Sequence, residues 1–410
     1  MRRLLALPLA LAVACRAAPI ANVAPGLSPN VERGASGAPI ELVETAPVET
    51  TLDHADLPEA FEIWRSMVDG AERSLDFAEF YASDEPGSRL EGVVESVERA
   101  AARGVRVRFL ADSKMAQTYP ATLDRLAAHG ADVRHFDVGT RMGGVLHAKY
   151  FLVDGREAFL GSQNFDWRSL EHIQELGVRV RDAEAVRELG SVFAMDWALA
   201  GGGTKPEPVS AASTVAHGPI EFVASPRDWL PPGVEWDLPH LVALIDGAER
   251  TVCVQLLTYR ADLEGERAFR DLEDALLRAA ARGVRVRLLL ADWCKRASTI
   301  GGLQRIEPVA NLEVRLVTIP PSSRGFIPFA RVIHSKYLAV DARDAWVGTS
   351  NWERDYFFRS RNVGVVLHEP ALAGRLERFF EDGWTSTYAT PVDPKARYAP
   401  PAISAAGDAR

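Results

Sequence analysis

The chain is poor in cysteine, in basic charge and in long apolar runs. Its 410 residues include only 3 cysteines, and 47 Lys and Arg stand against 56 Asp and Glu, which gives a formal net charge of −9. This balance argues against a protein that coats duplex DNA through a broad basic surface, but it leaves room for a small basic pocket. No segment after residue 15 is apolar for long enough to span a bilayer. The length predicts two or three folding units.

Two of the cysteines fall at predicted strands. Cys253 lies within the strand predicted at 251–257, and Cys294 follows the strand predicted at 284–291. If these strands are parallel neighbours, the two sulfurs lie about 20 Å apart at the rise of a strand, so we expect no disulfide. The nine histidines and three cysteines show no zinc-ligand spacing. We therefore expect neither a metal nor a cofactor.

The third cysteine, Cys15, ends a segment with the pattern of an export signal. Residues 1–15 have a short basic start and then about ten apolar residues that end in small ones, which is typical of a secretory signal rather than of a membrane span or a buried helix. The segment also resembles a bacterial lipoprotein signal, in which Cys15 is acylated and becomes the N-terminus, although Ala12 stands where such signals usually carry Leu. We expect an exported, membrane-anchored lipoprotein, with a periplasmic or secreted protein as the alternative.

The rest of the chain is duplicated. Residues 69–73 return as 246–250 with the same sequence, and residues 102–108 return, identical, as 281–287. In each half a strand pattern precedes an amphipathic helix, a glycine ends that helix, and an apolar strand follows. This order predicts two homologous α/β lobes with mostly parallel sheets, related by a pseudo-twofold axis, with an active site at their interface.

Composition divides the chain further. The predicted organisation is a signal peptide at 1–15, a flexible linker at 16–48, lobe 1 at 49–200, a linker at 201–217, lobe 2 at 218–389 and a flexible tail at 390–410.

One His-x-Lys motif occurs in each half, followed by matching residues. The two sets are His147, Lys149, Asp154, Ser162 and Asn164 in the first half, and His334, Lys336, Asp341, Thr349 and Asn351 in the second. In both, the Lys, Asp and Asn follow the His by 2, 7 and 17 positions. A lone His-x-Lys is most often a surface pair, but two copies at matched offsets inside a wider repeat indicate a shared site.

The spacing indicates how the motif folds. Residues 145–153 alternate like a strand, so His147 and Lys149 share one face. Asp154 begins a predicted hairpin turn, after which the chain returns through a Gly-Ser-x-Asn corner. Two such lobes facing each other bring two imidazoles, two ammonium groups and two amides to one pocket.

That set of groups suits phosphodiester chemistry. Lysine and asparagine side chains bind the negative oxygens and the charge that develops in the transition state. One neutral histidine attacks phosphorus, while the other, protonated, donates to the leaving oxygen. Water activated by the second histidine then releases the phosphohistidine, and no metal is required.

The pattern His-x-Lys-x4-Asp-x6-Gly-[Ser/Thr]-x-Asn resembles that of the phospholipase D superfamily, and the likeness extends over residues 40–388. Residues 160–170, 328–332 and 348–352 look like the animal lysosomal branch, family members three and four, which implies exonuclease action on single-stranded nucleic acid and a link to phospholipid chemistry. The first of these stretches also resembles bacterial cardiolipin synthases.

The resemblance implies that the lobes are not equivalent. Family members carry an acidic residue 28 positions after the first-lobe histidine, which orients that imidazole. Glu175 occupies this place, and Asn362 occupies the same place in lobe 2. We therefore expect Glu175 to accept from His147 and His147 to be the nucleophile, with His334 as general acid and base. The reverse assignment and a solvated Glu175 are the alternatives. Asp154 and Asp341 are expected to support the hairpins.

Three functions are compatible with these features. The first is a hydrolase acting on phospholipid or single-stranded nucleic acid, with no obligate protein partner. The second is a cardiolipin-synthase-like transphosphatidylase, although the two apolar anchor helices usual in bacterial synthases are missing. The third is an inactive binding protein on the same fold. The aromatic residues after the motifs are candidates both for a substrate groove and for the core: Trp167, Trp352, Tyr356 and Phe357.

Overall fold

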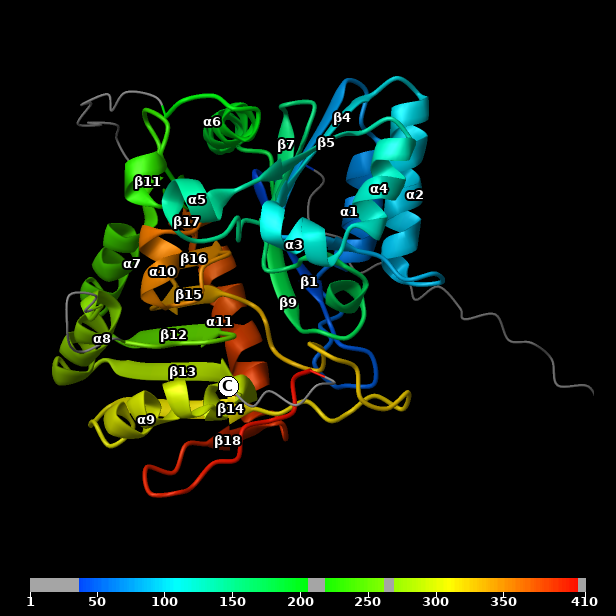
Figure 1. Cartoon of the computed structure of the whole chain (residues 1–410). Helices are drawn as coiled ribbons and strands as arrows, with labels where there is room; N and C mark the ends of the chain where they lie inside the picture. The colour runs from blue at the N-terminus through cyan, green and yellow to red at the C-terminus, as the bar shows by residue number, and fades with distance from the viewer. Residues whose placement is uncertain (1–36, 206–217, 262–268, 405–410) are drawn as a thin grey trace, which may run out of the picture.

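The computed structural model describes residues 37–205, 218–261 and 269–404. The predicted signal segment with Cys15 and most of the predicted linker at 201–217 lie outside the described residues. Figure 1 shows the described chain as two lobes side by side, with α1, α2 and α4 on the outer side of the first lobe and α7 and α8 on the outer side of the second. The predicted α/β class and the two-lobed architecture are confirmed.

Each lobe is built on one large sheet. In the described residues, the first sheet has the strand order β1-β9-β7-β6-β2-β4-β5 and the second has the order β11-β10-β17-β16-β15-β12-β13-β14-β18. The strands of lobe 1 are β1 (Ile40–Thr45), β2 (Ser74–Glu79), β4 (Arg106–Asp112), β5 (Asp132–Phe136), β6 (Tyr150–Val153), β7 (Glu157–Gly161) and β9 (Glu175–Val180), with β3 (Ala82–Ser83) and β8 (Phe165–Asp166) as a separate pair. Those of lobe 2 are β10 (Ile220–Ser225), β11 (Glu235–Trp236), β12 (Thr251–Leu256), β13 (Arg285–Ala291), β14 (Leu312–Val317), β15 (Tyr337–Val340), β16 (Asp344–Gly348), β17 (Asn362–Leu367) and β18 (Ala389–Pro391).

The pairing is mixed in both sheets. Strands β2, β4 and β5 are parallel, as are β12, β13 and β14, because helices connect them. Strands β6, β7 and β9 continue the first sheet in antiparallel pairings, and β15, β16 and β17 do the same in the second. The second half of each sheet therefore follows from the hairpin that comes after each His-x-Lys motif.

The helices are α1 (Ala60–Asp69), α2 (Arg89–Ala102), α3 (Ser113–Thr118), α4 (Ala121–Ala128), α5 (Val138–Met142) and α6 (Ala183–Ala200) in lobe 1, and α7 (Asp237–Asp246), α8 (Asp271–Ala281), α9 (Ala297–Ile306), α10 (Arg354–Phe358) and α11 (Pro370–Thr385) in lobe 2. Helix α2 begins after Ser88, whose side chain accepts from the backbone N–H of Glu91. It ends before Gly104, which has a φ of +92°, and Gly283 after α8 has a φ of +91°. The predicted glycine caps are confirmed.

A shared apolar core joins the two lobes. One cluster of buried residues contains Leu152 and Trp197 from lobe 1 together with Leu289 and Phe379 from lobe 2. These residues come from the inner faces of both sheets and from α6 and α11. The interface between the lobes is therefore packed like the interior of one domain, and it can hold a site to a fixed geometry.

Two predicted boundaries are wrong. Strand β1 lies inside the range 16–48 predicted as a linker, and it pairs with β9 along its whole length. In the predicted tail, β18 pairs with β14, and Ile403 is buried. Both segments are too short to show a period of their own, and partners distant in sequence supply their pairing. Among the described residues, no helix combines the length and the apolar character needed to cross a membrane.

Candidate active site

The two motif histidines are held by backbone contacts from the opposite lobe. His147 N–H donates to the Arg361 carbonyl at 2.9 Å, and Arg361 N–H donates to the Val145 carbonyl at 3.0 Å. The same exchange occurs in reverse, because His334 N–H donates to the Gln174 carbonyl at 2.8 Å and Gln174 N–H to that of Val332. The strand predicted at 145–153 thus begins only at Tyr150, since the residues before it pair with the other lobe.

A pocket of about 300 Å³ lies where these segments meet. Both motif histidines and both motif asparagines line it: His147, His334, Asn164 and Asn351. The side-chain oxygen of Asn164 is buried, and within the described part of the chain no hydrogen bond to it is formed. Asn351 Nδ2 donates to the Tyr356 hydroxyl at 3.2 Å. The pocket therefore offers two imidazoles and, among the described residues, one amide oxygen without a hydrogen-bond partner.

The predicted contact between Glu175 and His147 is wrong. Glu175 Oε2 lies 2.8 Å from His334 Nδ1, and both side chains are buried. The cause is the exchange of backbone contacts described above: Gln174 pairs with Ile333, so the next residue on β9 faces the imidazole of lobe 2. The hydroxyl of Ser169 donates to the other carboxylate oxygen at 2.9 Å.

His147 receives an amide instead of a carboxylate. Its Nδ1 lies 3.1 Å from Asn362 Oδ1. The amide nitrogen of Asn362 donates to the carbonyls of Tyr356 and Ser360, which fixes the amide with its oxygen toward the imidazole. His147 must therefore carry a proton on Nδ1, and Nε2 remains for a substrate.

The motif hydroxyls hold the two strands that carry these partners. Ser162 Oγ accepts from the backbone N–H of Leu176 at 2.9 Å, next to Glu175. In lobe 2, Thr349 Oγ1 accepts from Val363 N–H at 3.1 Å and donates to Asn362 Oδ1 at 2.9 Å. Both residues thus position the groups that bind the imidazoles.

The two motif lysines lie behind the histidines and do not line the pocket surface. Lys149 Nζ donates to the His147 carbonyl at 2.6 Å, and Lys336 Nζ donates to the carbonyl of His334. Both lysines are buried. Their ammonium groups therefore act on the pocket from below its floor, where water does not screen them.

Burial dominates the electrostatics of the site. It lowers the pKa of Lys149 to about 7, and it lowers the pKa of Lys336 well below its ordinary value. Burial, followed by the nearby lysines, also lowers the pKa of both His147 and His334 well below the usual imidazole value. Burial raises the pKa of Glu175 to about 8, and the lysines oppose that rise. An entering phosphate anion would stabilise the charged form of these lysines.

Sequence reasoning missed Glu79, which lies at the end of β2. This carboxylate is buried, its pKa is raised well above the ordinary value by burial, and Lys149 opposes that rise. Lobe 2 carries Leu256 at the end of the matching strand β12. The sequence did contain a signal for Glu79. It is a charged residue in an apolar strand, at a position where the other half of the repeat has leucine.

The motif aspartates lie at the hairpins, away from the pocket. Asp154 accepts hydrogen bonds from the backbone N–H groups of Arg73 and Ser74, at 2.7 and 2.8 Å, and from that of Glu72. Asp341 does the same for residues 249–251 in lobe 2. Each aspartate therefore joins the hairpin to the start of the central strand.

The aromatic residues divide between pocket and core. Tyr356 lines the pocket, and its ring lies edge-on to the imidazole of His147 with the centroids 4.8 Å apart. Trp352 and Phe357 belong to the core of lobe 2, and Trp167 packs against the core of lobe 1. Sequence reasoning missed the other aromatic rings of the pocket, which come from separate segments: Phe80, Tyr81, Tyr119, Trp293 and Phe329.

A buried ion pair fixes the lobes to each other beside the site. Arg361 contacts Asp196 of α6 through two hydrogen bonds of 2.8 Å, and neither side chain is exposed. Asp196 belongs to lobe 1 and Arg361 to the segment that binds His147. In the described residues, no group of three or more His, Cys, Asp or Glu could hold a metal ion, and Cys253 and Cys294 are free thiols.

Comparison with known proteins places the chain among two-lobed enzymes. The family described as "Cardiolipin synthase, PLD-like domain" matches residues 65–197 and 241–384, one match in each lobe. A probable phospholipase D of Caenorhabditis elegans is 30% identical over 387 residues, which cover 85% of this chain and 69% of that protein. The 5'-3' exonuclease PLD3 of Homo sapiens is 30% identical over 400 residues, which cover 87% of this chain and 81% of that protein.

Solved structures show the same architecture. A phosphatidylserine synthase of Haemophilus influenzae superposes with a TM-score of 0.60 over 81% of this chain and 85% of that one. The identity is 12%, so this likeness concerns the fold alone.

Proposed function

The chain belongs to the phospholipase D-like family of hydrolases, and on this premise we propose that it cuts phosphodiester bonds through a transient phosphohistidine. The observation that carries the proposal is the pair of imidazoles in one pocket. Each is bound at Nδ1 by a residue of the opposite lobe, Asn362 for His147 and Glu175 for His334. Both imidazoles therefore keep Nε2 for the substrate.

We assign His334 as the nucleophile. When Nε2 bonds to phosphorus, the ring becomes cationic, and the carboxylate of Glu175 at Nδ1 stabilises that cation. The amide of Asn362 does less for His147, so a protonated His147 gives up its proton more readily. The carboxylate thus favours His334 as the group that carries phosphorus and His147 as the group that moves the proton.

The reaction then follows two steps. A bound phosphate anion favours a second proton on His147, at Nε2. His334 Nε2 attacks phosphorus, the bond to the leaving oxygen breaks, and His147 gives its Nε2 proton to that oxygen. In the second step His147 takes a proton from water, the resulting hydroxide attacks phosphorus, and the bond between phosphorus and His334 breaks. Lys149, Lys336 and the amide of Asn164 stabilise the added negative charge.

The pocket lining favours single-stranded nucleic acid as the substrate. The rings of Tyr81 and Tyr119 are stacked with centroids 5.0 Å apart, and Phe80 lies beside His147 at 5.3 Å. Trp293 and Phe329 contribute aromatic rings from lobe 2. Rings on both sides of the reacting histidines suit the stacking of unpaired bases next to the phosphate that is cut. Relatives named 5'-3' exonucleases agree with this proposal.

The test compares two substrates on the purified protein. A 3'-labelled single-stranded oligonucleotide and phosphatidylcholine vesicles are offered in parallel, with glycerol added to reveal transfer to an alcohol. We expect stepwise shortening of the oligonucleotide and none with His334→Ala. Turnover of the vesicles alone would replace nucleic acid by phospholipid, and transfer to glycerol would favour a transphosphatidylase. No turnover of either substrate by a folded protein would contradict the proposal.

A further inference from the structure

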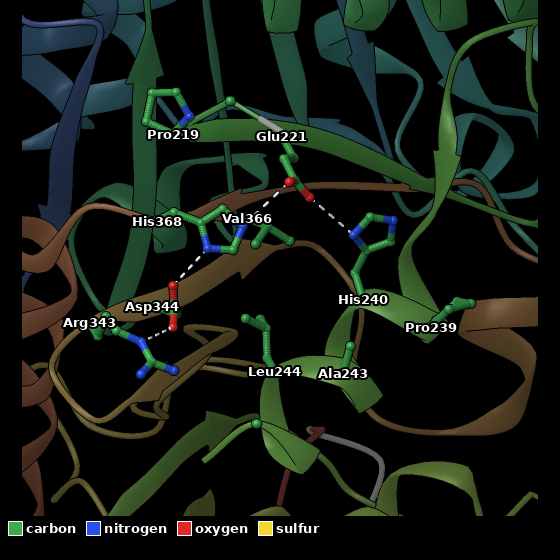
Figure 2. A pocket seen from close by; sticks show the side chains of 12 residues that line it. Pro219, Glu221, Pro239, His240, Ala243, Leu244, Arg343, Asp344, Val366 and His368 are labelled. Atoms are coloured by element: carbon green, nitrogen blue, oxygen red, sulfur yellow. Dashed lines mark hydrogen bonds and ion pairs between the residues drawn. The ribbon is translucent and has the colours of Figure 1, made fainter. Parts of the chain in front are cut away.

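Lobe 2 has a second cavity, away from the catalytic pocket. Its volume is about 770 Å³, and it is open to one side between α7 and the strands β10, β16 and β17. Pro239, Ala243 and Leu244 of α7 form one apolar wall. Figure 2 shows a row of charged and titratable side chains on the other side of this cavity. The mechanism proposed above uses none of them.

These side chains form a connected series. The imidazole of His368 lies between two carboxylates, with Nδ1 2.7 Å from Asp344 and Nε2 3.4 Å from Glu221 (Figure 2). Glu221 also lies 3.2 Å from His240 Nδ1, and Asp344 accepts from Arg343 Nε at 2.6 Å. Burial raises the pKa of Asp344, but the hydrogen bonds from Arg343 and His368 outweigh that effect and lower the pKa below its ordinary value. Asp344 is therefore ionised at neutral pH.

In lobe 1, different side chains occupy the position that corresponds to this cavity. Two carboxylates occur there as well, and two arginines bridge them. Arg179 Nε donates to Glu157 at 2.7 Å, and its Nη1 lies 4.0 Å from Glu41. Arg181 contacts the same two carboxylates, Glu41 at 3.4 Å and Glu157 at 3.7 Å. Lobe 1 thus holds two guanidinium groups against two carboxylates.

The strand registers show which residues correspond. Glu41 pairs with Arg179 across β1 and β9, and Glu221 pairs with Val366 across β10 and β17. Glu157 and Asp344 occupy the same place at the start of the last hairpin strand. His368, one residue after β17, therefore stands where lobe 1 has its second arginine. The first arginine is replaced by Val366, whose short side chain lines the cavity.

From this comparison we propose that the lobe 2 cavity binds a guanidinium group carried on an aliphatic stem, supplied either by a small molecule or by an arginine side chain of a peptide. The guanidinium contacts Glu221 and Asp344 beside the imidazole of His368, as Arg179 lies beside Arg181 in lobe 1. The stem packs along the apolar wall of α7, where Leu244 and Ala243 face the cavity (Figure 2). The planar group with its parallel N–H donors matches two carboxylates on neighbouring strands.

The charge of the cavity suits a cationic ligand. The charged and titratable groups that face it are Glu221 on β10, Glu235 on β11, His240 on α7, Arg343 and Asp344 at the start of β16, and His368 after β17. Among these groups, the three carboxylates outnumber the one guanidinium, so the cavity favours a cation.

The test measures binding by calorimetry with two probes on the full chain. Agmatine represents a free small molecule, and a capped peptide with one central arginine represents a protein segment; the same peptide with norleucine is the blank. We expect one equivalent of probe to bind at pH 8, and binding of the peptide alone would identify a protein as the source. Failure of both probes to bind at millimolar concentration would overturn the proposal.

Three variants locate the binding. Glu221→Gln should weaken it at least tenfold, and Val366→Arg, which restores the residue of lobe 1, should abolish it. Glu41→Gln, the matched change in lobe 1, should leave it unchanged, as should His334→Ala in the catalytic pocket. Probe binding that survives Glu221→Gln, or that is lost with His334→Ala, would contradict this site. The result does not depend on whether the enzyme cuts nucleic acid.

Discussion

Replacing Glu175 with glutamine keeps the shape of the side chain but removes a carboxyl group that can ionise. Burial raises the pKa of Glu175 to about 8, so its negative charge acts on His334 when the cationic phosphohistidine forms. The change leaves the pocket lining intact, since Glu175 lies behind the imidazole. A glutamine can still meet the Ser169 hydroxyl and the ring N–H. The variant therefore isolates the effect of the charge on the phosphohistidine step.

The expected size of the effect follows from the geometry. Glu175 and His334 are buried, and their facing atoms are 2.8 Å apart. At a separation of about 4 Å between charge centres and an effective dielectric constant near 20, a carboxylate stabilises an imidazolium by about 4 kcal/mol. The glutamine amide returns about 1 kcal/mol through a neutral hydrogen bond. The net loss of about 3 kcal/mol corresponds to a rate of adduct formation that is roughly 100-fold lower.

The assay is rapid mixing with a nitrophenyl phosphodiester, with acid quench and measurement of phosphate bound to protein. Since Glu175 does not touch the substrate, kcat should fall and KM should change little. Ser169→Ala is the matched control, because it removes the 2.9 Å bond to the same carboxylate but leaves its charge. That variant should lose less than about tenfold. A Glu175→Gln enzyme that forms adduct at more than a third of the wild-type rate would refute the assignment of His334.

Four further predictions concern the chemistry of the pocket and the stability of the fold. With a nitrophenyl phosphodiester, His147→Ala should still form an adduct and hold it, whereas His334→Ala should form none; peptide mapping that finds the label on His147 in the wild type contradicts this. Turnover should survive excess EDTA, and a loss that divalent ions restore would require a metal. Because burial lowers the pKa of Lys149 to about 7 and a bound phosphate favours the charged amine, KM should rise as pH increases above 7, by up to about tenfold per unit, and a flat profile from pH 6 to 9 would argue against that role. Asp341→Asn should lower the free energy of unfolding in urea by about 2–4 kcal/mol without changing the activity of the folded fraction, because it weakens three backbone contacts.

The duplication made most of the fold accessible from the sequence. Repeated segments such as 102–108 and 281–287 predicted the lobes, the parallel strands and the glycine caps. Strands β1 and β18 were missed, because each is an edge segment that becomes a strand only through pairing with a distant partner. Local pattern contains no information about such partners.

The sequence could indicate which residues form the site, but it could not indicate which of them contact each other. The matched spacing singled out His147, His334 and two asparagines, and the structure brings these four residues to one pocket. A count of 28 residues places Glu175 on the strand beside the motif, but it does not say which histidine that strand faces. The answer depends on the bridges between the lobes, where Gln174 pairs with Ile333. Contacts of this kind follow from the docking of two surfaces, and no single segment determines them.

Each lobe supplies the residue that binds the histidine of the other lobe. This arrangement across the pseudo-twofold axis explains why the lobes have diverged at particular positions. Each imidazole depends on the other lobe, so a change in one lobe alters only the histidine of the other, and a symmetric pair can acquire two roles. Glu175 against Asn362 is such a change, and Glu79 against Leu256 is a second, which places a carboxylate beside only one of the two lysines. The replacement of Arg179 by Val366 at the outer edge is a third, and there it opens a cavity instead of changing a catalytic group. In all three cases a charged side chain of lobe 1 stands opposite an uncharged residue of lobe 2, on a framework of strands that has kept its register. The sheet thus preserves the positions, and the roles that we propose for the two lobes follow from the substitutions at those positions.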